Sequence, residues 1–152
     1  VILNSSKLHD YGLTQTAVYL AGNLGEKVNT DHQIDVSAIL LPSFSGVNSA
    51  QAPRIEMSAE TVDIQFEGKS KKTEIITIGN VGNAELNISS LQMFTSGLRI
   101  SLDKSRLQPG EYGKLKITAI QADLQKVRTR PRILMITNDP KKPKVTININ
   151  TK

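Results

Sequence analysis

The chain has 152 residues, a length that suits one domain, or one domain with part of another. It contains no cysteine, which excludes disulfides, thiol nucleophiles and thiolate metal sites from this chain. Hydrophobic residues make up 38%, with three Phe, three Tyr and no Trp, so Ile, Leu and Val must fill the core. No stretch is long and apolar enough for a membrane-spanning helix, and no secretory signal opens the chain. Because the initiator Met is missing, we expect a mature or trimmed product, and the absence of a signal here says nothing about export.

The first 41 residues hold the end of one strand, at residues 1–3, and two further strand candidates, but too little chain for a core of their own. The candidates are residues 14–20 and 33–40. One face of the second candidate carries Ile34, Val36 and Ala38. Two or three strands cannot bury a core alone. This segment must therefore pack against the rest of the chain, against another copy or against a missing domain, and we expect residues 1–41 to be the C-terminal strands of a preceding, truncated sandwich domain.

Residues 42–53 are predicted to form a linker. They are small and polar and are bounded by Pro42 and Pro53, a composition unsuited to helix or strand. Phe44 is the exception. We interpret it as an anchor that docks the linker on a neighbouring domain, in preference to a ligand-facing role.

The stretch 74–88 gives the clearest fold signal. Ile76 and Ile78 alternate with polar neighbours, and the alternation resumes at residues 86–88. Residues 80–83 between them are types that tolerate positive φ and close a chain reversal. The stretch therefore predicts a β-hairpin.

Strand signals recur through residues 54–152 at the spacing of a sandwich. Besides the two strands above, they cover residues 55–66, 98–102, 112–120, 132–137 and 144–150. The run 132–137 is almost continuously apolar, as in a strand covered on both faces. Residues 107–111 have the Pro-Gly pattern of a type II turn, and residues 119–127 are a weak helix candidate. These seven signals predict an all-β fold, an Ig-like antiparallel β-sandwich over residues 54–152.

Three motifs in a fixed order carry a resemblance to a known family. They are Ile76-Thr77-Ile78-Gly79-Asn80-Val81-Gly82-Asn83-Ala84-Glu85-Leu86-Asn87-Ile88, Leu107-Gln108-Pro109-Gly110-Glu111 and Ile136-Thr137-Asn138-Asp139-Pro140. In that order the chain resembles the Ig-like domains of unknown function in exported proteins of Bacteroidetes, which are similar to major-sperm-protein and cilium-associated Ig-like domains. The resemblance implies tandem domains, in which residues 1–41 would be the C-terminal strands of a preceding, truncated Ig-like domain. It also implies a periplasmic, cell-surface or secreted location and no catalytic residues. A Cys pair that many members carry is missing here.

No group of residues forms a recognisable catalytic or metal-binding pattern. His9 and His32 lie in loop-like sequence without a nucleophile or a third ligand nearby. Asp139 is interpreted as a turn cap and not as a calcium ligand, because no acidic cluster accompanies it. We therefore predict that the chain is not an enzyme and has no catalytic, cofactor-binding or metal-binding residues and no cofactor.

The favoured function is a non-catalytic Ig-like binding or scaffolding module that contacts protein, or a neighbouring domain of its own chain, through strand edges and loops. The edges expected to be free are residues 55–66 and 144–150. Residues 1–41 could also mediate a homo-oligomer.

Two other functions stay open. Tyr11, Tyr19 and Phe44 are the aromatic candidates for contact with a partner, and they would also suit a carbohydrate- or cell-wall-binding accessory domain. The net charge of +5 gathers late, at Lys126, Arg128, Arg130, Arg132, Lys141, Lys142 and Lys144. Because no aromatic residue is interleaved there, we interpret these residues as a solvated face and expect no nucleic-acid partner.

Overall fold

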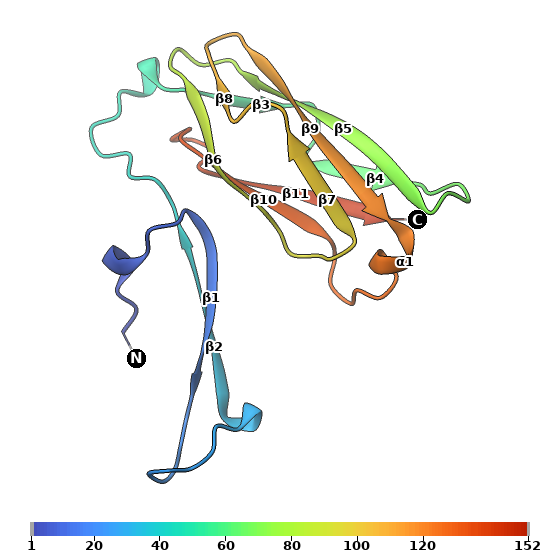
Figure 1. The fold of residues 1–152 in the computed structure, drawn as a ribbon. Coiled ribbons are helices and arrows are strands. Elements are labelled where there is room, and N and C mark those ends of the chain that lie inside the picture. Colours follow the sequence, from blue (N-terminus) through green and yellow to red (C-terminus); the bar gives the residue numbers. More distant parts are fainter. Residues whose placement is uncertain (1, 152) are drawn as a thin grey trace.

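The computed structural model describes residues 2–151, which form a two-stranded hairpin and a β-sandwich (Figure 1). The strands are β1 (Gly12–Tyr19), β2 (Gln33–Leu40), β3 (Ile55–Met57), β4 (Thr61–Ile64), β5 (Lys71–Asn80), β6 (Leu86–Met93), β7 (Leu98–Leu102), β8 (Arg106–Leu107), β9 (Tyr112–Ile120), β10 (Arg132–Thr137) and β11 (Lys144–Thr151). The helical elements are α1 (Gln121–Leu124) and the short turns Ser5–Lys7, Thr30–His32 and Ser49–Gln51. The all-β prediction is confirmed. No helix in this part of the chain is long and apolar enough to cross a membrane.

The hairpin of β1 and β2 projects away from the sandwich and meets it at one end (Figure 1). Its strands pair antiparallel, from Gly12 opposite Leu40 to Tyr19 opposite Gln33. Eleven of the fifteen large hydrophobic side chains that are exposed in the described chain belong to residues 2–47. A two-stranded ribbon cannot bury its own faces, so this part of the chain leaves apolar surface uncovered.

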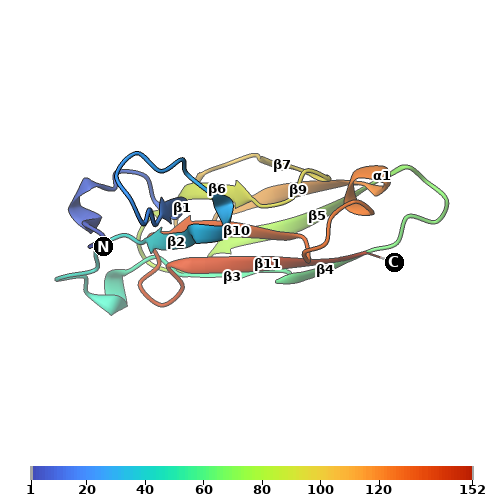
Figure 2. The ribbon, with the colours of Figure 1, turned by 90° about the horizontal axis from the view of Figure 1, so that it is seen from below.

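The sandwich consists of two sheets that pack face to face (Figure 2). One has the strand order β4-β11-β10-β6-β8, and the other has the order β3-β5-β9-β7. Alternate residues of each sheet point inward, which is the reason that a period of two appears in the sequence. The fully buried core residues include Ile78, Leu86, Leu115, Ile117, Ile133 and Ile147.

β10 is covered on both faces, as its apolar run predicted. Ile133 and Met135 belong to the core between the sheets. Leu134 and Ile136 point to the outer face and lie outside that core, yet they are only 6% and 0% exposed. β1 packs against β6 and β10 on this side, so the N-terminal hairpin covers part of the outer face of the five-stranded sheet.

The prediction of a hairpin over residues 74–88 is wrong. β5 belongs to the four-stranded sheet and β6 to the five-stranded sheet, so the chain crosses between them. Positive φ does not occur in the crossing. Instead, the buried Asn80 donates through Nδ2 to the carbonyls of Ala84 (2.8 Å) and Leu107 (2.9 Å) and accepts a bond from the Gly82 N–H (3.0 Å). This side chain satisfies backbone groups of the crossing and of β8, and so ties the crossing to the five-stranded sheet.

The last strand is not the edge strand that was predicted. β11 lies between β10 and β4, and its residues 148–151 pair with β4, so the free edge is lost over that part of the strand. The first strand region, 55–66, does lie at sheet edges, but it splits into β3 in one sheet and β4 in the other. β4 runs parallel to β11, with Thr61 opposite Asn148, the one parallel pair in the described sheets. No local sequence pattern marks such a distant pairing.

Local turn and helix features agree more closely with the sequence. The Glu111 N–H donates to the Gln108 carbonyl (2.9 Å) and Gly110 has φ of +79°, as a type II turn requires. The weak helix candidate is the single turn α1. Asp139 caps its turn by accepting a bond from the Lys141 N–H (2.8 Å).

Candidate binding groove between the hairpin and the sandwich

The hairpin is attached to the sandwich through the side chain of Gln92. Gln92 lies on the outer face of β6, opposite Leu134 of β10. The Leu13 N–H donates to Oε1 of Gln92 (2.7 Å), and Nε2 of Gln92 donates to the Leu13 carbonyl (3.2 Å). The amide side chain therefore pairs with Leu13 as the backbone of a neighbouring strand would. We call these two hydrogen bonds the Gln92 latch.

Gly12 allows the close approach that the latch needs. It is buried and has φ of +111°, a conformation that favours glycine. A Cβ atom at this position would lie 2.5 Å from Oε1 of Gln92 and 3.0 Å from Oγ of Ser90. A larger residue would push the hairpin away from β6.

Beyond the latch, β1 has a free edge. The Leu20 N–H donates to the His32 carbonyl (3.0 Å), so the even-numbered residues of β1 turn their backbone groups toward β2. The odd-numbered residues turn theirs to the opposite edge, where the latch occupies those of Leu13. Within residues 2–151, no hydrogen bond engages the amides of Gln15, Ala17 and Tyr19.

Hairpin and sandwich together enclose a groove beside the latch, which we call the junction groove. It comprises two cavities of about 280 and 470 Å³ that share Leu13, Gln15, Phe94 and Arg132. The hairpin forms one wall, and the outer face of β10 and β11 forms the floor. Further lining residues include Ser37, Ile39, Arg130, Leu134, Lys144 and Asn148.

The junction groove is basic. Arg130, Arg132 and Lys144 line it, and no acidic residue does. None of these three cations forms a salt bridge within residues 2–151. The guanidinium of Arg132 lies over the ring of Phe94, 5.6 Å from its centroid, which holds the cation at the groove wall. The groove therefore presents unneutralised positive charge beside apolar surface.

A separate exposed ion pair, outside the junction groove, joins Lys104 and Glu111. Their hydrogen bond lowers the pKa of the Glu111 carboxyl, and a bond from the Gln108 N–H lowers it further. The same Lys104–Glu111 bond raises the pKa of the Lys104 ammonium. The pair stabilises the turn between β8 and β9 and has no part in the groove.

The described residues contain no cluster that could bind a metal ion. No group of three or more His, Asp or Glu lies close enough to hold a metal ion there, and His9 and His32 are exposed. A cavity of about 250 Å³ at the linker end of the sandwich includes Asp139. Its carboxylate is occupied by hydrogen bonds from the Ile55 N–H (2.9 Å) and the Lys141 N–H (2.8 Å).

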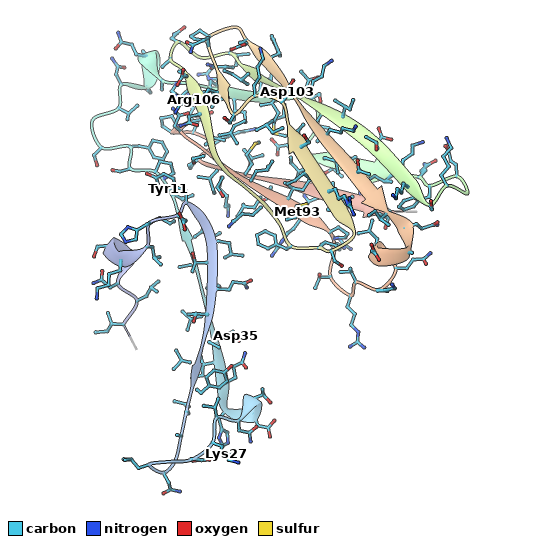
Figure 3. The ribbon with its side chains drawn as sticks, in the orientation of Figure 1. Tyr11, Lys27, Asp35, Met93, Asp103 and Arg106 are labelled. Atoms are coloured by element: carbon cyan, nitrogen blue, oxygen red, sulfur yellow. The ribbon has the colours of Figure 1, made fainter. Side chains whose placement is uncertain are left out.

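The three aromatic residues suggested for partner contact do not gather into one cluster. Figure 3 shows Tyr11 at the end of the hairpin nearest the sandwich. Tyr19 ends β1, so roughly 25 Å of extended chain separates the two. Tyr11 and Tyr19 are 40% and 42% exposed, and Phe44 is half-buried. Their role in partner contact stays a prediction for each residue separately.

Sequence reasoning missed Gly12 and Gln92, because neither belongs to a motif. The basic residues were recognised, and the structure adds that Arg130, Arg132 and Lys144 line one groove. The three cations line one groove because the hairpin docks on β10. The apolar run of β10 was the sequence feature that indicated a cover on its outer face.

Comparison with known proteins assigns the sandwich to a family. The model of the HYDIN/CFA65/VesB-like, Ig-like domain matches residues 53–152. The chain belongs to this Ig-like family. The predicted Ig-like sandwich is thereby confirmed, and membership fits a non-catalytic module. No curated protein is similar to this Ig-like chain in sequence.

Solved structures extend the likeness beyond the sandwich. A protein of unknown function from Porphyromonas gingivalis W83 is 23% identical with a TM-score of 0.73, and the match covers 93% of this chain and 66% of that chain. Since 93% exceeds what the sandwich alone supplies, the shared fold includes part of the segment before residue 53. The VesB protease of Vibrio cholerae is 14% identical with a TM-score of 0.52, over 64% of this chain and 31% of that chain. The chain spans less than two thirds of either structure, and at these identities the likeness shows the fold alone. The predicted resemblance to proteins of Bacteroidetes is supported here through the P. gingivalis structure and not through the family model.

Proposed function

We propose that this Ig-like chain is a non-catalytic binding or scaffolding module of an exported or cell-surface protein, and that it acts through protein–protein contact. The observation that carries the proposal is the incomplete hairpin beside a complete sandwich. Its strands have free edges, and its exposed apolar side chains include Ile34, at 48% exposure, and Leu20, at 59%. Exposed ladders and apolar surface of this kind call for a covering polypeptide. The location follows from the resemblance to exported Bacteroidetes proteins.

The covering polypeptide we favour is a preceding domain of the same protein. Residues 1–41 would be its closing strands, 42–53 the linker and 54–152 the next sandwich. The linker end is fixed to the sandwich, because the Val81 N–H donates to the Arg54 carbonyl (2.9 Å) and the Asn83 N–H donates to the Ala52 carbonyl (3.1 Å). With the Gln92 latch, these bonds would hold a preceding domain in one orientation. A second copy of the chain is the alternative cover.

Photo-crosslinking tests the proposal. A benzoylphenylalanine replaces Tyr19 in the protein translated from the full reading frame, and the same probe at Lys116, on the exposed face of β9, serves as the control. We expect a cross-link from position 19 to residues that precede this chain in the same molecule. A link to a second copy would replace the tandem arrangement with a homo-oligomer. No link above the Lys116 control would contradict protein contact by the hairpin.

The exposure of Tyr11 and Tyr19 supports one alternative, a carbohydrate- or cell-wall-binding accessory domain. Glycan-array binding that is lost in Tyr19→Ala and kept in Tyr112→Ala would favour it. Tyr112 is the matched control, since it is 55% exposed on the sandwich. A blank array would remove the basis of this alternative.

A further inference from the structure

We infer that the junction groove binds an extended acidic polypeptide segment, with two carboxylates four residues apart and an apolar side chain midway between them. The inference rests on the proposed function in protein contact and names the chemistry of the partner. Its basis is the charge and register of the groove floor.

The register of β10 and β11 sets the spacing of the cations. Arg132 lies opposite Asn148, and Lys144 lies opposite Ile136, so Arg132 and Lys144 are four strand residues apart on one face. At the rise of an extended chain this is about 13 Å. Side chains four residues apart in a bound extended segment point to the same side at the same spacing. Two carboxylates at that separation therefore face the two cations.

The middle of the groove is apolar. Leu134 lies midway between the two cations along the floor and is almost fully buried, so the accessible apolar surface of this cavity comes from Leu13 and Ile39 of the hairpin. Ile39 is 41% exposed, which leaves apolar surface to be covered. The residue two positions after the first carboxylate points to the same side of an extended segment, so an apolar side chain there would contact the accessible parts of Leu13 and Ile39. Arg130 lines the larger of the two cavities and adds a third cation to the groove.

A polypeptide fits these features better than a nucleic acid. Single-stranded nucleic acids bind by stacking bases on free aromatic rings. The aromatic ring that lines the groove is Phe94, and the Arg132 guanidinium already lies over it. A phosphate backbone would also place charged groups against the apolar centre between the cations, where they have no polar partner. The test must therefore distinguish binding of a peptide from binding of a nucleic acid.

Fluorescence anisotropy with a short peptide tests the inference on the full chain. The probe is a labelled, end-blocked peptide of sequence Ser-Glu-Ser-Leu-Ser-Glu-Ser. We expect binding that weakens as salt rises, because the ion pairs remain partly exposed to solvent. R132Q and K144Q should each weaken it about fivefold, the upper range for one exposed ion pair. The matched substitutions R99Q and K116Q, on exposed faces of the other sheet, should leave it unchanged.

A second peptide checks the register. Deleting the serine between the leucine and the second glutamate moves that carboxylate to the opposite side of the extended chain. We expect this peptide to bind about as weakly as the first peptide binds to K144Q. Thermal unfolding of each variant confirms that the sandwich is intact.

Several results would overturn the inference. They are equal binding of the two peptides, no effect of R132Q and K144Q, no binding of the first peptide, or an oligonucleotide that binds the groove in its place. If the peptides fail while the Tyr19 cross-link forms, the groove inference falls and the proposed function stands. If the cross-link fails while the first peptide binds, protein contact through the free edge of the hairpin falls, and the groove inference stands.

Discussion

Replacing Gln92 with alanine is expected to release the hairpin from the sandwich while the sandwich stays folded. The side chain lies on the outer face of β6, away from the core between the sheets. Its removal eliminates both hydrogen bonds of the latch, at 2.7 and 3.2 Å, and leaves the Leu13 N–H and carbonyl to water.

The size of the effect follows from the two bonds. A partly buried hydrogen bond contributes a net of about 0.5–1.5 kcal/mol, so the latch contributes roughly 1–3 kcal/mol to hairpin attachment. This corresponds to a roughly 5- to 150-fold increase in the opening equilibrium. The packing of β1 against β6 and β10 remains, so the hairpin would stay partly attached.

Amide hydrogen exchange followed by NMR measures this opening. The Leu13 amide in Q92A should exchange faster by the factor above, whereas the amide of the core residue Ile117 should keep its rate. Q65A is the matched control, because Gln65 is exposed in the sandwich outside the latch. An unchanged Leu13 rate in Q92A would refute the latch, and an equal acceleration at Ile117 would show that the substitution unfolds the sandwich.

The remaining predictions concern the sandwich and one exposed ion pair. N80A should lower the free energy of unfolding by about 3 kcal/mol or more, because it leaves buried backbone groups without their partner; urea denaturation measures this, with N150A as the surface control. G82A should cost about 1–3 kcal/mol, because the added Cβ would lie 2.3 Å from a backbone nitrogen of the linker end. K104Q should raise the pKa of Glu111 toward its ordinary value, since the lost hydrogen bond is the main cause of the lowered pKa; an NMR titration of the Glu111 carboxyl measures it.

The sign of the pH effect follows from the lowered pKa of Glu111. The stability that Glu111 gains from the pair is present above the ordinary glutamate pKa, about 4.3, and is lost as the pH falls through the lower folded value. The stability difference between the native chain and K104Q should therefore shrink in acid. A carboxyl that titrates alike in both proteins would contradict this. For the buried positions, N80A or G82A with native stability would show that the crossing between the sheets tolerates their loss.

Alternation of side chains predicted the long strands of the sandwich but not the short β8, and it could not predict which sheet each strand joins. Ile76, Ile78, Leu86 and Ile88 all point into one core, whether β5 and β6 pair with each other or lie in opposite sheets. The decision rests on Asn80, a polar side chain that takes over backbone bonds deep in the structure. In the sequence, Asn80 looks like an ordinary turn residue.

The groove was predictable only in part, because it forms between distant segments. The sequence shows the late cations and the doubly covered strand β10. It does not show that Gly12 and Gln92 bring the hairpin to that face, since these residues are 80 positions apart and each is common on surfaces. The register of β10 with β11 then places Arg132 and Lys144 four strand residues apart on one face.

The most direct test of the central claim is hydrogen exchange at the free edge of β1. The amides of Gln15, Ala17 and Tyr19 should exchange quickly in residues 1–152 alone. In the protein translated from the full reading frame, we expect these amides to be protected at least tenfold, because a strand of the preceding domain would pair with them. Equal exchange rates in the two proteins would contradict the claim that the hairpin is the closing part of a neighbouring sandwich.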